Sequence, residues 1–301
     1  EIVPNGALEV KEVAKTPKGQ KSYSVLGKKW GRARLTITYE DGKQQTVNYK
    51  VIKPETEVVK DFGHFLATEQ WFNDPNDPFH RNPSFISYDY DAKRKLTEDS
   101  RVWISGLSDE GGAGSWLAAI MKQLVLPERS EIQKIQKFID STLWGDIQYS
   151  GGPHKYGVKK SVFYYEPDSL PKGTYSDGIN YKTWAAWNHE HANDPGRSYN
   201  YPHVTAAYWV MYRLARYRKG LVDNRTWEWY LNNAYHTSIA MLEQAPYYSV
   251  FGQMEGSVFL YLLNDLKSEG YLKMGNELEA KMKERANHWR ALDYPFGSEM
   301  P

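Results

Sequence analysis

The spacing of apolar residues changes along this chain, and that change constrains the fold more than any other feature. Before Pro54, apolar and polar residues alternate in two runs, 35–39 and 47–51, which is typical of half-buried strands. The Asp-Gly pair at 41–42 lies between them and predicts a two-residue hairpin turn of type I′. Because an isolated hairpin is only marginally stable, we expect residues 1–55 to form a β-sandwich portion or linker strands.

Beyond Pro54 the apolar residues follow helical spacing, so we expect a mainly α domain over residues 56–301. A capping box, Ser130 with Gln133, predicts one helix start, and Asn200 predicts another. About seven helices are expected from the apolar spacing. Short turns between successive helices are typical of αα-hairpins.

A long segment without clear periodicity separates two groups of these helices, between Trp144 and Tyr201. It is rich in aromatic residues, and short strands are expected within it, around Val162 to Tyr165. Irregular segments of this length inside a compact domain are often functional. We therefore expect this segment to contribute to a binding site.

Composition excludes several classes of function. The chain has 38 basic and 37 acidic residues and a net charge of +1, which predicts no nucleic-acid or membrane surface. It contains no cysteine, which excludes disulfides, cysteine nucleophiles and thiolate zinc sites. Neither a phosphate-binding glycine loop nor a serine nucleophile elbow occurs in the sequence. We expect no cofactor and no metal.

Aromatic residues make up 15% of the chain, with 11 Trp, 23 Tyr and 10 Phe. The mean hydropathy is only −0.70, so these rings belong to a polar protein. Rings with a polar tip suit the faces of sugars, which offer apolar area beside hydroxyl groups. An ordinary aromatic core is the alternative, and composition does not choose between them.

Candidate catalytic residues are carboxylates beside glycines or at expected helix starts. Asp109 and Glu110 precede two glycines that would let the backbone approach a ligand, although helix capping explains them equally. Glu299 follows Gly297 in an aromatic turn. Glu190 lies between His189 and His191, but two histidines two residues apart do not match the zinc-protease pattern, so a polar sugar-binding loop is favoured over a metal site.

Five motifs occur in order between residues 60 and 301. They are Ser108-Asp109-Glu110, Leu143-Trp144-Gly145, Tyr201-Pro202-His203-Val204, Thr226-Trp227-Glu228-Trp229-Tyr230-Leu231 and Tyr294-Pro295-Phe296-Gly297-Ser298-Glu299-Met300. Together they resemble a glycosidase-like family of unknown function in the six-hairpin (α/α)6 toroid superfamily. The resemblance implies a β-sandwich followed by a helical toroid that acts on a polysaccharide. Since about seven helices cannot complete six hairpins, we expect the toroid to continue beyond the chain end or to be completed by a second chain.

The first functional hypothesis is a glycoside hydrolase that acts on a polysaccharide or oligosaccharide. Glycosidic cleavage uses one carboxyl group as a proton donor and a second as base or nucleophile. The candidates for these two roles are Asp109, Glu110, Glu190 and Glu299. The candidates for binding sugar rings and hydroxyls are Trp116, Trp187, His189, His191, Tyr201 and His203. Such a substrate predicts a secreted or periplasmic location.

Two alternatives stay open. A polysaccharide lyase would use Tyr and His as acid and base and a cation to neutralise a uronate. The residues that fit those roles are Tyr199, Tyr201, His189, His203 and Arg197. The other alternative is a carbohydrate-binding protein without catalysis.

Overall fold

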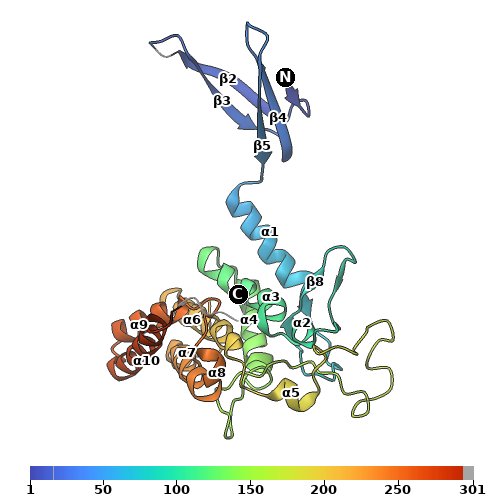
Figure 1. Cartoon of the computed structure of the whole chain (residues 1–301), viewed down its shortest axis with the longest axis vertical. Helices are drawn as coiled ribbons and strands as arrows, with labels where there is room; N and C mark the ends of the chain where they lie inside the picture. Colours follow the sequence, from blue (N-terminus) through green and yellow to red (C-terminus); the bar gives the residue numbers. More distant parts are fainter. Residues whose placement is uncertain (16, 294–301) are drawn as a thin grey trace. The chain divides into compact units, whose positions relative to one another are not determined.

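The computed structural model describes residues 1–15 and 17–293, apart from the side chain of Glu110 (Figure 1). The chain divides into two compact units, Glu1–Asp61 and Phe62–Pro301. The sequence places the boundary at residue 55, where helix α1 (Glu55–Thr68) begins, and the division falls within this helix.

The first unit is built from strands. An antiparallel sheet has the order β1-β4-β5, and β2 pairs with β3 in a separate hairpin. Their small core consists of Ala7, Leu8 and Ala33 with partly buried neighbours. The strands are β1 (Ile2–Val3), β2 (Leu8–Lys15), β3 (Lys21–Gly27), β4 (Gly31–Thr38) and β5 (Gln44–Val51).

The predicted hairpin is confirmed as β4 and β5, but its turn differs from the expected one. The N–H of Gly42 donates to the carbonyl of Tyr39, and the N–H of Tyr39 donates to the carbonyl of Lys43, both at 2.9 Å. Gly42 has a φ of 79°. This is a three-residue loop that ends in a left-handed glycine, in place of a two-residue type I′ turn.

The second unit is mainly helical. With α1, seven helices of ten or more residues lie within the described residues, the number that the apolar spacing predicts. The six others are α3 (Asp109–Val125), α4 (Arg129–Phe138), α6 (Tyr201–Tyr217), α7 (Trp227–Gln244), α9 (Val258–Ser268) and α10 (Leu272–Arg290). Shorter elements are α2 (Val102–Ser105), α5 (His189–Asn193), α8 (Pro246–Ser249), the π-helical turn η1 (Ile139–Leu143), the 3₁₀ turn η2 (Ser198–Asn200) and the strands β6 (Trp71–Phe72), β7 (Ser84–Phe85), β8 (Tyr88–Asp89) and β9 (Arg94–Lys95).

Helix α6 lies at the centre of this unit, packed against α3, α7 and α9 (Figure 1). Its residues 201–212 are all buried, as expected of a helix covered on every side. The chain is thus mainly α with N-terminal strands, whereas the toroid stays a prediction. Among the described helices, none combines the length and the apolar character needed to cross a bilayer.

At the starts of α4 and α6, the side chains expected to cap the helix do not do so. Helix α4 begins one residue before Ser130, and the Glu128 carboxylate accepts from the Ser130 N–H at 3.4 Å. Asn200 is at the N-cap of α6, but its side-chain amide donates to the Lys159 carbonyl at 2.9 Å. Ser130 and Asn200 are both residue types that favour N-cap positions. At each helix start, however, a different side-chain contact is formed.

The irregular segment between η1 and α5 shares an aromatic core with residues that precede α3. Phe163 and Tyr181 of the segment are buried there with Phe79 and Val102, and further tyrosines pack around them. The strands expected around Val162 are absent from the described structure of this segment, because its N–H donates to the Gly106 carbonyl in a single link and not in a ladder. Much of the aromatic content of the segment therefore stabilises the fold.

A buried ion pair holds this aromatic core. The guanidinium of Arg81 donates to both carboxylate oxygens of Asp77, with Nη2 to Oδ1 at 2.6 Å and Nε to Oδ2 at 3.0 Å. Its centre also lies 5.0 Å from the Phe79 ring and 5.2 Å from the Phe163 ring. Both charged side chains are less than 5% exposed.

Candidate functional site

The candidate site lies where α3 and α6 begin, beside α8 and the loop that follows it. The turn η2 packs against both α3 and α8. Arg197 precedes η2 and donates from Nε and Nη2 to the Asp109 carboxylate at 2.8 and 2.5 Å. Tyr199 contacts the Tyr248 ring with centroids 5.7 Å apart. Three segments that are distant in sequence thus meet at these helix ends.

Asp109 is the first residue of α3, and its side chain is 5% exposed. Its backbone has a φ of 51°, in the left-handed region that a residue with a side chain seldom adopts. Strained positions of this kind concentrate at functional sites. The guanidinium of Arg197 compensates the buried charge of the carboxylate and also lies 5.1 Å from the Tyr199 ring.

His203 lies in the first turn of α6 and is 3% exposed. Its Nδ1 is 2.6 Å from the Oε2 atom of Glu255, which comes from the loop before α9 and has a φ of 51°. A carboxylate beside one ring nitrogen of a histidine orients the ring, so that the other nitrogen can exchange a proton with a ligand. Within the described residues, Nε2 of His203 has no hydrogen-bond partner.

Several other buried polar atoms near His203 have no partner within residues 1–15 and 17–293. They are Ser198 Oγ, Asn200 Oδ1 and Thr205 Oγ1. Leaving such groups without a hydrogen bond costs about 1–3 kcal/mol each, so native proteins satisfy them with water or a ligand. The start of α6 therefore has the unpaired polar groups that a hydrogen-bonding ligand needs.

The backbone at Lys159 and Lys160 joins these helix ends to the segment around α5. Ser108 Oγ donates to the Lys160 carbonyl. The Nζ atom of Lys160 is 2.6 Å from Asp194 Oδ2 and 5.9 Å from the centre of the Trp187 ring. Burial raises the pKa of Asp194, but hydrogen bonds from Lys160 and from the Gly196 N–H outweigh it and lower that pKa overall.

Three tryptophans form a surface beside this lysine, which we call the tryptophan platform: Trp103, Trp184 and Trp187. The Trp103 ring is 5.6 Å from Trp184 and 5.1 Å from Trp187, centre to centre. Trp184 is 81% exposed. An exposed ring of this size beside polar side chains is typical of sites that bind sugar faces or other flat apolar surfaces.

The predicted residues of the α5 segment lie next to this platform. The His191 ring stacks on Trp187 at 6.3 Å, and the His189 ring lies 4.4 Å from that of Tyr164. Both histidines and Glu190 are exposed, and the Asn188 side chain caps the short helix that carries them. This segment therefore presents Trp187, His189, Glu190 and His191 together.

Trp116 and Tyr201 are placed differently from their expected sugar-stacking role. Trp116 is 1% exposed, and its indole N–H donates to the Leu107 carbonyl at 2.8 Å. Tyr201 is fully buried and donates to the Pro195 carbonyl at 2.7 Å. Both rings pack in the hydrophobic core, so neither is exposed to stack on a sugar ring. The side chain of Glu110 and all of Glu299 lie outside the described residues.

Sequence reasoning missed one pair of perturbed charges, Asp146 and Lys159. Burial raises the pKa of the Asp146 carboxyl, and the positive charges of His80 and Lys159 oppose that rise. Burial also lowers the pKa of the Lys159 ammonium, which lies 5.0 Å from the Tyr149 ring. Both residues lie in irregular segments, where no periodicity could have brought them together. Among the described residues, no three His, Asp or Glu side chains converge as a metal site.

The two glycines after Glu110 serve packing, although the sequence predicts close approach to a ligand. A Cβ on Gly112 would lie 2.2 Å from the Trp103 carbonyl oxygen, and one on Gly111 would lie 2.8 Å from Cγ1 of Ile104. Helix α3 can therefore approach α2 closely only because these positions lack side chains.

A Gly112→Ala variant is expected to lower the free energy of unfolding by about 1–3 kcal/mol, because the backbone of α2 must shift. Gly114→Ala, in the same helix, has nothing within 4 Å of its new methyl group. This control is expected to gain up to about 1 kcal/mol from its higher helix propensity. Urea unfolding of both variants measures the difference, and equal effects would contradict the packing role.

Comparison with known proteins places the chain in a family. It belongs to the Family of unknown function (DUF5695), whose model matches residues 1–301. A solved structure titled as a polysaccharide lyase is similar to it, with a TM-score of 0.60 and 18% sequence identity. The match covers 96% of this chain and 37% of the other, so the chain spans little more than a third of that protein. At this identity the likeness shows the fold alone. No curated protein matches the chain.

Proposed function

We propose that this chain is part of a carbohydrate-active enzyme that cleaves a polysaccharide by β-elimination, as in the lyase alternative of the sequence analysis. The observation that carries the proposal is buried His203, which has Glu255 at one ring nitrogen and no partner within the described residues at the other. The likeness of the fold to a polysaccharide lyase supports the substrate class.

In β-elimination, a base takes the proton from the carbon beside a uronate carboxylate, and an acid protonates the departing glycosidic oxygen. We assign the base to Nε2 of His203, because Glu255 stabilises the imidazolium that forms. We assign the acid to Tyr199, whose ring lies beside the Arg197 guanidinium. The same guanidinium supplies positive charge toward the carbanion that develops at the uronate.

The tryptophan platform then serves to bind the polysaccharide chain. Trp184 and Trp187 offer faces for sugar rings, and the exposed His189, Glu190 and His191 offer partners for their hydroxyls. Because the Lys159–Lys160 backbone joins this surface to the start of α6, a bound chain would extend from the platform toward His203.

Hydrolysis is the second candidate, and Asp146 is the observation that favours it. A glycosidase needs a carboxyl group with a raised pKa as proton donor and an ionised carboxylate as its partner. Burial raises the pKa of the Asp146 carboxyl, whereas the second carboxylate would be Asp109, which is paired with Arg197. Glu110, Glu299 and Glu190, which is exposed, also stay candidates in this second proposal.

An assay of the full-length protein on a panel of acidic and neutral polysaccharides distinguishes the two reactions. Elimination forms a C=C double bond, so ultraviolet absorbance and reducing ends are expected to rise together. A rise in reducing ends alone would overturn elimination and support hydrolysis. If both signals stay flat while the protein still binds a polysaccharide, the catalytic proposal is wrong and the binding-only alternative stands.

A further inference from the structure

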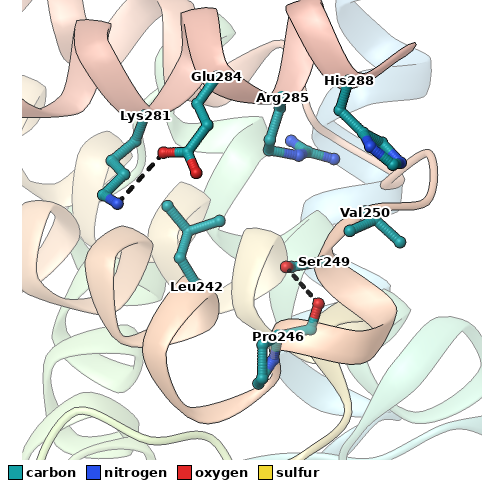
Figure 2. A pocket seen from close by; sticks show the side chains of 8 residues that line it. All are labelled: Leu242, Pro246, Ser249, Val250, Lys281, Glu284, Arg285 and His288. Carbon is teal, nitrogen blue, oxygen red and sulfur yellow. Dashed lines mark hydrogen bonds and ion pairs between the residues drawn. The ribbon is translucent and has the colours of Figure 1, made fainter. Parts of the chain in front are cut away.

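A cavity of about 270 Å³ lies between α10 on one side and α7 and α8 on the other (Figure 2). Leu242, Ser249 and Val250 form one wall, and Lys281, Glu284, Arg285 and His288 project from α10 toward them. The cavity is slightly smaller than the ~300–1,000 Å³ of sites for drug-sized molecules, so it suits a single small ligand such as one sugar unit.

Arg285 is the unusual group in this cavity. Its Nη2 donates to the Phe251 carbonyl at 2.8 Å, and its guanidinium lies 4.8 Å from the Trp289 ring. Its Nε is buried and has no hydrogen-bond partner within the described residues, and no described carboxylate lies within ion-pair distance of the guanidinium. Burial lowers the pKa of this side chain, which reflects the same uncompensated charge. A half-buried guanidinium without a carboxylate is costly, and an anionic ligand would lower that cost.

The other charged side chains of the cavity do not cancel the positive charge of Arg285. Glu284, the acidic residue of the lining, is 3.3 Å from the Nζ atom of Lys281, so these two charges offset each other. Arg285 remains, together with His288, which adds positive charge when protonated. The planar fork of a guanidinium, here with an unpaired Nε–H, matches a carboxylate better than a spherical anion.

The cavity is connected to the candidate site through one short loop. The indole N–H of Trp289 donates to the Val250 carbonyl at 2.5 Å, next to the Phe251 carbonyl that Arg285 binds. This loop continues to Glu255, which meets His203. The loop that lines the basic cavity at Val250 therefore also carries the carboxylate that meets His203.

We propose that this cavity is a subsite for the carboxylate of an acidic sugar unit, bound by the Arg285 guanidinium. The choice of a sugar as the source of the carboxylate rests on the proposed function. A simple carboxylate or an inorganic anion shares the charge but not the ring, so the test compares these sources directly.

The first experiment titrates the full-length protein with glucuronate, glucose, acetate and phosphate by calorimetry. Glucuronate is expected to bind at least about tenfold more tightly than the other three, since hydrogen bonds to a charged partner are the stronger kind. Equal binding of glucuronate, acetate and phosphate would overturn the acidic-sugar subsite and leave a general anion site. Equal binding of glucuronate and glucose would show that the carboxylate is not recognised.

Variants of α10 test whether glucuronate binds at Arg285. Arg285→Gln is expected to weaken glucuronate binding at least about tenfold, and Arg285→Lys is expected to recover only part of it, because an ammonium lacks the planar fork. Arg290→Gln, an exposed position on the same helix, is the matched control and is expected to bind as the wild type does. Thermal unfolding of each variant checks the fold. If Arg285→Lys folds normally and Arg285→Gln still binds glucuronate like the wild type, the proposal is wrong.

The cleavage assay separates this inference from the proposed function. If the protein cleaves an acidic polysaccharide and Arg285→Lys leaves its KM unchanged, the subsite fails and the function stands. If no polysaccharide is cleaved but glucuronate binding depends on Arg285, the subsite stands and the cleavage proposal fails.

Discussion

A His203→Gln variant of the full-length protein is expected to lose about 10²–10⁴-fold in kcat on the polysaccharide that the wild type cleaves. Glutamine keeps similar polarity at this 3% exposed position but cannot take up a proton. The loss is expected in kcat more than in KM, because the proton transfer occurs in the transition state. Initial rates from the ultraviolet assay measure it.

Two further variants test whether His203 acts with Glu255. Glu255→Gln is expected to lower kcat by less than His203→Gln, because it removes the charge beside Nδ1 but leaves the base itself in place. The double variant is expected to be no slower than His203→Gln alone, since residues that act as a unit are not additive. His64→Ala, an exposed histidine on α1, is the control. Retention of more than a tenth of the wild-type kcat in a folded His203→Gln protein would contradict the assignment.

Arg81→Met is expected to lower the free energy of unfolding by about 3–5 kcal/mol. The substitution leaves the Asp77 carboxylate buried without its partner, and both side chains are less than 5% exposed. It also leaves the carbonyls of Thr97 and Ser105 without their bonds to Nη1, which are 2.7 and 2.9 Å long. Denaturant unfolding monitored by tryptophan fluorescence measures the loss.

The double variant Arg81→Met with Asp77→Asn is expected to recover part of this loss, because the uncompensated charge is gone. Arg101→Met is the matched control, since Arg101 pairs with Asp99 at 3.0 Å but is 56% exposed. Its expected cost is below about 1 kcal/mol, as for other exposed pairs. A similar loss for Arg81→Met and Arg101→Met would refute the role of burial.

Local periodicity was enough to predict the long helices and the N-terminal hairpin, but not the short strands β6–β9. Alternation before residue 55 and helical spacing after it are properties of a few neighbouring residues, so the β4–β5 hairpin and the long helices follow from them. The exact turn at Gly42 and the Glu128 cap did not follow, because several local arrangements use the same residue types and differ little in energy.

The candidate site was only partly predictable, because local sequence patterns do not reveal contacts between residues that are far apart in the chain. Asp109 and His203 were recognisable because each lies where an expected helix begins. Arg197 was a candidate for the lyase alternative, but its pairing with Asp109, 88 residues away, was not predictable. Nor was the contact of His203 with Glu255, which comes from the loop before another helix. Trp103 and Trp184 were missed in the same way, because they meet Trp187 through packing. A sequence identifies candidate functional residues, whereas tertiary packing determines which of them are in contact.

The bonds from α10 to the Val250 and Phe251 carbonyls have a consequence for biosynthesis. Trp289 and Arg285 are 39 and 34 residues later in the chain than the carbonyls they bind. While the ribosome is still translating α10, the residues of α3 and α6 have already been synthesised, but the loop with Glu255 lacks the donors that fix it. The contact between His203 and Glu255 is therefore expected to become fixed only after Arg285 and Trp289 have left the ribosome.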